Sequence, residues 1–284
     1  MKDFNYFDLV GRNWGSITKE DQLKIKNFKV GIIGCGGQGG HIVSTLAYCG
    51  VGFFRCSDGD VFEVSNLNRQ ILSNSKTLGR NKAERACEYV KDVNPFIETE
   101  VIPEHINTKN IDRMIEGLDL VINNSDNFET KALSSRKCKE KGIPFIFAHM
   151  FNPAFIHISY QDPNGISVEE ALNMPTLQHK ELTDELLKKL FAVNYRERLE
   201  RKIEIGCVKE WKESNINADK IVWNSFAPFI GITSNYIAHE AICCILKRDM
   251  YIPVSCPDFL HINVMKREIK IINTNKEQLN WKSI

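Results

Sequence analysis

Two neighbouring stretches of the chain carry residue types that can bind a phosphate compound. Residues 34–39, GCGGQG, match the pattern G-x-G-x-x-G, and the polar stretch 58–70, DGDVFEVSNLNRQ, begins 19 positions after its last glycine. Glycines allow the backbone to approach a phosphate, and the N-terminus of a following helix attracts its negative charge. The glycines of the first stretch are Gly34, Gly36, Gly37 and Gly39.

The first acidic residue of the polar stretch is compatible with two kinds of enzyme. Asp58 ends an apolar run, at the position where dinucleotide sites place the acid that binds a ribose hydroxyl. The glycine loop and Asp58 alone therefore also fit an NAD-dependent oxidoreductase, which is the alternative interpretation. A third interpretation is a glycine-rich turn that binds no ligand. It does not explain why a predicted strand precedes the loop, a predicted helix follows it and Asp58 ends the next strand.

Positive charge and a further acid favour ATP over NAD. Arg69 lies in the same stretch as Asp58 and Asp60, and Lys82 follows in GRNKAE. A triphosphate that is attacked at its α-phosphorus needs Arg, Lys and a metal ion to neutralise the departing pyrophosphate. Asp126, in NNSDNF, supplies the hard oxygen ligand that Mg²⁺ prefers. No histidine or Tyr–Lys pair is placed for hydride transfer.

Alternating strands and helices position these residues. Apolar runs predict strands at 29–36, 51–58, 96–103, 118–126 and 143–150, and amphipathic segments predict helices at 16–28, 39–50, 80–94, 110–117 and 127–142. This order predicts an α/β fold, a Rossmann-like doubly wound sheet that is mainly parallel. A long helix within 223–249 and a hairpin within 259–272 predict an antiparallel C-terminal extension. In such sheets ligands bind beyond the carboxyl ends of the strands, where the candidate residues converge.

We expect one domain over residues 1–284. Its predicted parts are an N-terminal arm and helix (1–27), a nucleotide-binding core (28–160), a charged helical crossover excursion (161–222), and a C-terminal helix and hairpin (223–284). Thr18 is a plausible N-cap for the first helix, since acidic residues follow it.

Four segments together resemble the ThiF/MoeB/HesA family, relatives of the ubiquitin-activating enzymes. The segments are GIIGCGGQGG, SDGDVFEVSNLNRQIL, GRNKAE and NNSDNFETK, and the resemblance covers roughly residues 5–160. It implies that ATP and Mg²⁺ adenylate a carboxylate, usually the C-terminal glycine of a ubiquitin-like sulfur carrier. The implied product is an acyl-adenylate, with release of pyrophosphate.

The resemblance also implies roles for individual residues. The glycine loop would hold phosphates, Asp58 the ribose and Asp126 the Mg²⁺, with Asp60 in the same nucleotide site. The triphosphate would be bound by Asn66, Arg69, Gln70 and Lys82. Arg12, in GRNWG, matches an arginine that the family supplies to the phosphates across a homodimer.

Several residues depart from the family pattern. The nine cysteines form no C-x-x-C pair, so the chain is expected to be a zinc-free member. Lys131 stands where relatives have an arginine, which keeps the charge but loses the bidentate fork. Cys207 lies where some relatives form a thioester or persulfide, although a plain thiol is the alternative, and Cys243 and Cys244 are expected to be packing residues. His149 is a candidate to face the substrate, or else a satisfied histidine at a strand end.

Composition restricts the partners. A net charge of +1 gives no electrostatic signal for nucleic acid or an anionic membrane, and no apolar run is expected to reach the roughly 18–20 residues of a membrane span. We therefore expect a cytoplasmic protein. The substrate is predicted to be a ubiquitin-like carrier or a ribosomal precursor peptide, and the lack of a basic stripe argues against the tRNA-modifying branch. A non-catalytic nucleotide sensor would be expected to have lost some of the residues that bind the triphosphate. This chain retains all of them, which argues against a sensor.

Overall fold

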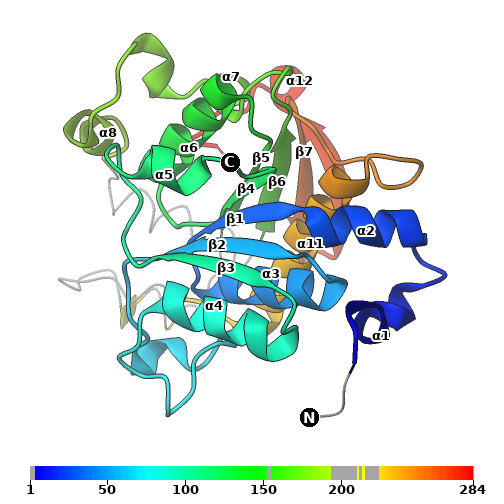
Figure 1. The fold of residues 1–284 in the computed structure, drawn as a ribbon. Helices are drawn as coiled ribbons and strands as arrows, with labels where there is room; N and C mark the ends of the chain where they lie inside the picture. Colours follow the sequence, from blue (N-terminus) through cyan, green and yellow to red (C-terminus); the bar gives the residue numbers. More distant parts are fainter. Residues whose placement is uncertain (1–3, 152–154, 193–209, 211–212, 215–223, 284) are drawn as a thin grey trace.

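The computed structural model describes residues 4–151, 155–192, 210, 213–214 and 224–283. One sheet of eight strands crosses the molecule, in the order β3-β2-β1-β4-β5-β6-β7-β8 (Figure 1). The strands are β1 (Lys29–Ile33), β2 (Phe53–Ser57), β3 (Glu98–Ile102), β4 (Leu120–Asn123), β5 (Phe145–Phe151), β6 (Phe155–Gln161), β7 (Asp258–Asn263) and β8 (Glu268–Asn273).

The direction of strand pairing divides the sheet in two. Strands β1 to β5 pair in parallel, whereas β6, β7 and β8 are added in antiparallel fashion. The predicted fold class, a mainly parallel doubly wound sheet with an antiparallel C-terminal extension, is confirmed. The sequence pattern did not assign β6, which pairs with β5 from Phe145↔Gln161 to Phe151↔Phe155.

Helices cover both faces of the sheet (Figure 1). The α-helices are α1 (Tyr6–Val10), α2 (Lys19–Asn27), α3 (Gly37–Cys49), α4 (Lys82–Val93), α5 (Ile111–Ile115), α6 (Phe128–Lys141), α7 (Val168–Ala171), α8 (Asp184–Leu190), α11 (Ala227–Leu246) and α12 (Thr274–Glu277). Short 3₁₀ turns are η1 (Gly11–Asn13), η2 (Val64–Asn66) and η3 (Pro175–Gln178).

Two hydrophobic clusters pack these layers. One lies between the sheet and α2, α3, α4 and α11, and the other lies between the sheet and α5, α6, α7 and α8. Because strand side chains alternate between faces, Val30 and Ile32 of β1 enter the first cluster and Ile33 enters the second. Full burial of one such side chain stabilises the fold by about 1.5–3 kcal/mol.

Helix boundaries follow capping residues, as the sequence predicted. The Thr18 hydroxyl accepts the Asp21 N–H at 3.1 Å and the Asp21 carboxylate accepts the Thr18 N–H at 3.0 Å, a capping box that starts α2. Gly50 ends α3 in the left-handed region, with φ of 91°. Asp21 also accepts from Arg248, which follows α11, with Nε and Oδ1 3.0 Å apart. This ion pair joins the N-terminal helix to the C-terminal part of the chain.

The long helix α11 lies within residues 223–249, where the sequence predicted a helix. An 18-residue window within this 20-residue helix has a mean hydropathy of 1.4, so by length and composition alone the helix could cross a membrane. In the fold, 67% of the helix window is buried, and α11 packs against α2, α3 and the sheet. One mostly buried helix of this kind is what the core of a soluble protein also contains.

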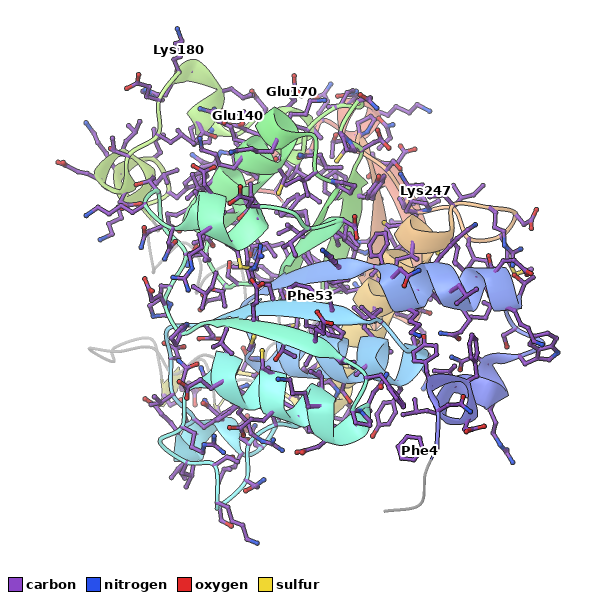
Figure 2. All side chains as sticks on the ribbon, in the orientation of Figure 1. Phe4, Phe53, Glu140, Glu170, Lys180 and Lys247 are labelled. Carbon is purple, nitrogen blue, oxygen red and sulfur yellow. The ribbon has the colours of Figure 1, made fainter. Side chains whose placement is uncertain are left out.

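The outer surface over α6, α7 and α8 carries charges of both signs. Figure 2 shows Glu140, Glu170 and Lys180 along this layer, and all three are exposed. Arg136 on α6 forms a mostly buried ion pair with Glu169 on α7, and its guanidinium also donates to the carbonyls of Thr176 and His179. This ion pair joins α7, which follows β6 in the chain, to α6.

Candidate active site

A cavity of about 890 Å³ opens beyond the carboxyl ends of β1, β2, β4 and β5. This volume lies within the roughly 300–1,000 Å³ that small-molecule sites occupy. The predicted site residues that line it are Gly34, Gly36, Gly37, Asp58, Asp60, Asn66, Arg69, Gln70, Lys82 and Asp126. The structure therefore brings residues from four separate segments to one place.

The glycine loop is shaped by close backbone contacts. Gly34 has a φ of 89°, and its carbonyl accepts from the Asn124 amide at 2.6 Å. A Cβ on Gly39 would lie only 1.9 Å from the same carbonyl oxygen. Gly39 itself does not line the cavity, and its lack of a side chain lets α3 approach the loop. Gly36, Gly37 and the first turn of α3 form the cavity wall, where free N–H groups favour an anion.

Asp58 connects the glycine loop to the polar loop. Its Oδ2 accepts the Cys35 N–H at 2.8 Å, and its Oδ1 accepts the Asp60 N–H at 2.9 Å. Burial raises the pKa of the Asp58 carboxyl, while these two N–H groups and the Lys82 charge oppose the rise. Each carboxylate oxygen keeps a further lone pair that can accept a hydroxyl donated by a ribose.

The two predicted phosphate-binding cations differ in their surroundings. The Lys82 ammonium lies 2.8 Å from Asp60, whose other oxygen is 3.4 Å from His105 Nε2. Arg69 is half-buried, and it donates to the Ser65 carbonyl and the Asn68 side chain. Burial lowers the pKa of Arg69, and among the described residues no carboxylate forms an ion pair with it. Arg69 is therefore the cation whose charge is available to an anionic ligand.

Three buried polar atoms on residues of the cavity wall have no hydrogen-bond partner among the described residues. They are Gln38 Nε2, Gln70 Oε1 and Asn124 Oδ1. A buried amide without a partner costs about 1–3 kcal/mol, so such atoms mark positions that a ligand can satisfy. One donor and two acceptors, together with the free N–H groups of α3, fit a polar anionic ligand such as a nucleotide.

Asp126 lies exposed at the cavity, on the turn that follows β4. Lys131 does not line the cavity; it is 1% exposed, and its ammonium donates to the carbonyl of Ser125, the residue before Asp126. The Ser125 hydroxyl also bonds to the Asn123 side chain at 2.7 Å. Lys131 thus holds the backbone next to Asp126.

Sequence reasoning missed several lining residues. Gln38 and Asn124 stand within the recognised motifs, but only the structure shows their unpartnered amide atoms. Ile230 of α11 lines the cavity near Gly37 from nearly 200 residues away, and no local pattern identifies it. His149 lines the cavity, which is compatible with the interpretation that it faces the substrate. It is 5% exposed, and the centroid of its ring lies 4.5 Å from that of Phe128.

Two other predicted residues lie elsewhere. Arg12 is exposed on η1 and does not line the cavity. It lies on the side of the sheet where β1 begins, with α1 and α2 (Figure 1). Cys207 lies outside the described residues. All eight cysteines that the structure describes are free thiols.

The sequence matches the family model described as "ThiF family" over residues 10–281. It is 33% identical over 135 residues to the SAMP-activating enzyme E1 of Haloferax volcanii, covering 48% of this chain and 50% of that protein. It is 35% identical over 127 residues to the adenylyltransferase and sulfurtransferase UBA4 of Saccharomyces cerevisiae, covering 45% of this chain and 29% of that protein. The chain spans half or less of the length of these curated relatives.

Solved structures share the fold at low sequence identity. The crystal structure of E. coli MccB has a TM-score of 0.67 and 24% identity, and the match covers 89% of this chain and 64% of that one. PaaA has a TM-score of 0.64 and 19% identity, with 89% of this chain and 66% of that chain covered. A family model matched over nearly the whole length, on a fold with this strand order and this cavity, shows that the chain belongs to the ThiF family.

Proposed function

We propose that this chain is an ATP- and Mg²⁺-dependent adenylyltransferase that activates a carboxylate on a small protein or peptide. The observation that carries the proposal is the cavity wall. It is lined by the start of α3, by Arg69, which has no carboxylate partner among the described residues, and by three residues whose buried amide atoms have no hydrogen-bond partner among the described residues. An NAD enzyme would use the glycine loop and Asp58 but would leave the cationic side of this cavity without a function.

The proposed reaction joins a substrate carboxylate oxygen to the α-phosphorus of ATP. The bond from that phosphorus to the oxygen of the β-phosphate breaks, and pyrophosphate leaves. A carboxylate is already ionised at neutral pH, so no general base is needed and catalysis depends on positioning and charge. Arg69, Lys82, Asn66 and Gln70 would hold the triphosphate. Mg²⁺ held by Asp126 would neutralise charge on the pyrophosphate.

We infer the substrate class from the relatives. One relative is named as activating SAMP, and MccB has been solved with MccA and with ATP. We propose that the substrate of this chain is likewise the carboxylate of a ubiquitin-like carrier or of a precursor peptide. The near-zero net charge supports a protein or peptide over a nucleic acid.

We further propose a cytoplasmic homodimer in which residues 1–284 act as one adenylation domain and Arg12 reaches the cavity of the partner. Support comes from the position of Arg12, which is exposed and outside its own chain's cavity, and from Trp14 beside it, which is 63% exposed. We also propose that Cys207, which lies outside the described residues, forms a thioester or persulfide.

Calorimetry tests the nucleotide without knowledge of the substrate. The protein is titrated with ATP plus Mg²⁺, with AMP, with NAD⁺ and with NADH. Tight binding of ATP with Mg²⁺ but not of NAD⁺ or NADH supports the proposal. Binding of NAD⁺ or NADH alone would identify an oxidoreductase instead. Arg113→Ala, an exposed arginine outside the cavity, is the control for Arg69→Ala and should bind ATP like the wild type.

A further inference from the structure

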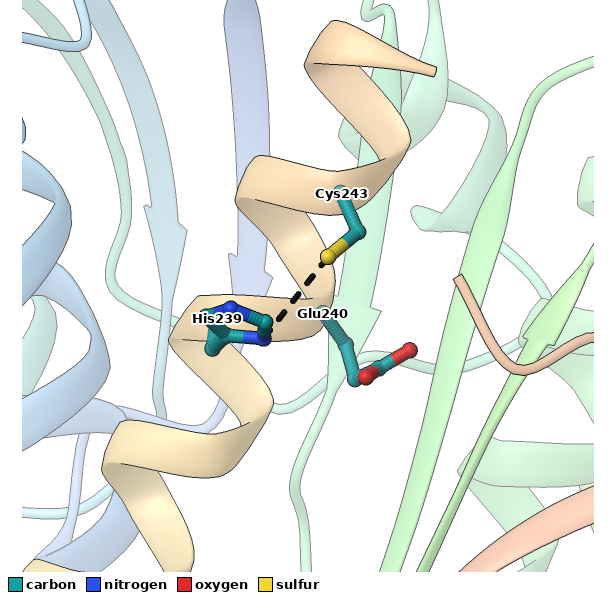
Figure 3. A group of neighbouring side chains, drawn as sticks. All are labelled: His239, Glu240 and Cys243. Carbon is teal, nitrogen blue, oxygen red and sulfur yellow. Dashed lines mark hydrogen bonds between the residues drawn. The ribbon is translucent and has the colours of Figure 1, made fainter. Parts of the chain in front are cut away.

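A second cluster of chemically active side chains lies on α11, apart from the cavity. His239, Glu240 and Cys243 offer ligand atoms that all lie within 4.8 Å of one another (Figure 3). His239 and Cys243 are four residues apart, so they share one face of the helix. Ile230, which lines the cavity, is nine residues earlier, or about 13 Å along the helix axis. The cluster is therefore separate from the nucleotide site.

The distance between the cysteine sulfur and the histidine nitrogen matches the distance between two ligand atoms of one metal ion. Cys243 Sγ and His239 Nδ1 lie 3.6 Å apart, along the dashed line in Figure 3. A tetrahedral Zn²⁺ with Zn–S of about 2.3 Å and Zn–N of about 2.1 Å separates its sulfur and nitrogen ligands by about 3.6 Å. The side chains are thus already placed at the separation that a shared ion requires.

Glu240 can complete three protein ligands while keeping its structural role. Its Oε2 accepts the Val254 N–H at 2.8 Å, and this bond ties α11 to the segment before β7. One of its carboxylate oxygens lies within 4.8 Å of the ligand atoms of His239 and Cys243. Glu240 and Cys243 are buried whereas His239 is exposed, so an ion can enter from the solvent on the histidine side.

We propose that His239, Glu240 and Cys243 form a binding site for a zinc-class divalent cation, with water as the fourth ligand. One thiolate, one imidazole and one carboxylate suit Zn²⁺ or Co²⁺ better than Mg²⁺, which prefers oxygen ligands only. The site has a single cysteine, so it differs from the paired C-x-x-C pattern whose absence led us to expect no zinc. A bound ion would strengthen the link between α11 and Val254.

Cobalt binding tests the site directly. The full chain, stripped of metal, is titrated with Co²⁺ in excess Mg²⁺, which competes for sites that consist of oxygen ligands. We expect one equivalent of Co²⁺, with tetrahedral visible bands and a thiolate-to-cobalt charge-transfer band. Cys243→Ser should abolish the charge-transfer band. His239→Ala should weaken binding about a hundredfold, because even residues outside the ligand sphere account for about 10–100-fold.

Matched controls keep the test decisive. Cys49→Ser and His179→Ala remove the same residue types at half-buried positions outside the cluster and should bind Co²⁺ like the wild type. Because His239 is exposed, His239→Ala decides the question even if Cys243→Ser fails to fold. The absence of one tightly bound equivalent, or an unchanged spectrum and affinity in His239→Ala, would overturn the proposal. A rise in melting temperature with Zn²⁺ that is lost in His239→Ala would support it.

Discussion

Replacing Gly39 with alanine should damage the nucleotide site, although alanine is the better helix former. The Cβ would lie 1.9 Å from the Gly34 carbonyl oxygen, 2.9 Å from its carbon and 3.0 Å from the Asn124 amide nitrogen. Two of these three atoms belong to the backbone, so the clash cannot be relieved by a rotamer change. The loop that carries Gly34 must move away from α3, and it takes the cavity wall with it.

The magnitude follows from two opposing effects. Overpacking that displaces backbone costs up to about 3 kcal/mol, and the gain in helix propensity from glycine to alanine returns about 1 kcal/mol. The net loss of about 2 kcal/mol should lower the melting temperature by roughly 3 °C, given about 2 cal/mol/K of unfolding entropy per residue over the whole chain. ATP affinity should fall about ten- to hundredfold, as for other ångström-scale misplacements.

Two matched variants separate the site from the fold. Gly52→Ala places its Cβ 1.8 Å from the Lys26 carbonyl oxygen, outside the cavity, so it should lower the melting temperature but spare ATP affinity. Gly37 lies in the cavity wall, and in Gly37→Ala the atom nearest the new Cβ is 3.5 Å away. The stability of this variant should therefore not fall. Differential scanning fluorimetry and calorimetry with ATP measure both quantities. Wild-type melting temperature and ATP affinity in Gly39→Ala would refute the reasoning.

Three further predictions concern charge. Arg69→Ala should weaken ATP binding about 10–100-fold but change AMP binding little, because a charged hydrogen bond contributes about 1.5–3 kcal/mol and AMP lacks the outer phosphates; calorimetry that finds equal losses for both nucleotides would count against a phosphate role. Asp126→Ala should remove the Mg²⁺ dependence of ATP affinity without lowering the melting temperature, and a Mg²⁺ effect of wild-type size would exclude Asp126 as the ligand. The hydrogen bond from Arg248 holds the pKa of Asp21 below its usual range. The contribution of the ionised Asp21 carboxylate to the free energy of unfolding is therefore complete above about pH 4, and it is lost as the pH falls further and the carboxylate is protonated. The difference in melting temperature between wild type and Asp21→Asn should be largest at neutral pH and shrink below pH 4; a constant difference would disprove this.

The sequence predicted the parts of the fold that local chemistry controls. Thr18 and Gly50 cap their helices as expected, and Asp58 follows β2 directly, because caps and strand ends depend on adjacent residues. Strand β6 was not assigned, since its pairing with β5 and β7 is a tertiary property. The long helix α11 was predicted within residues 223–249, but its apolar composition alone does not distinguish a core helix from a membrane span, and only the burial of its window in the fold does.

For the site, the residue types were predictable but their pairing was not. Asp60 stands in the predicted set, yet only the structure shows that it forms an ion pair with Lys82 and so leaves Arg69 as the cation without an acidic partner among the described residues. Lys131 was expected to carry charge near the ligand and instead supports the Ser125 carbonyl. Such contacts depend on side-chain direction, which neither motif nor spacing specifies.

The ion pair between Asp21 and Arg248 can form only late during synthesis on the ribosome. The two residues are 227 positions apart, and at about 5–20 residues per second the second emerges roughly 11–45 s after the first. Throughout that interval α2 exists without the guanidinium that balances its buried carboxylate, and Ile25 lacks the α11 side chains of the finished core. The contacts of α2 with Arg248 and α11 are therefore among the last that this early part of the chain can make.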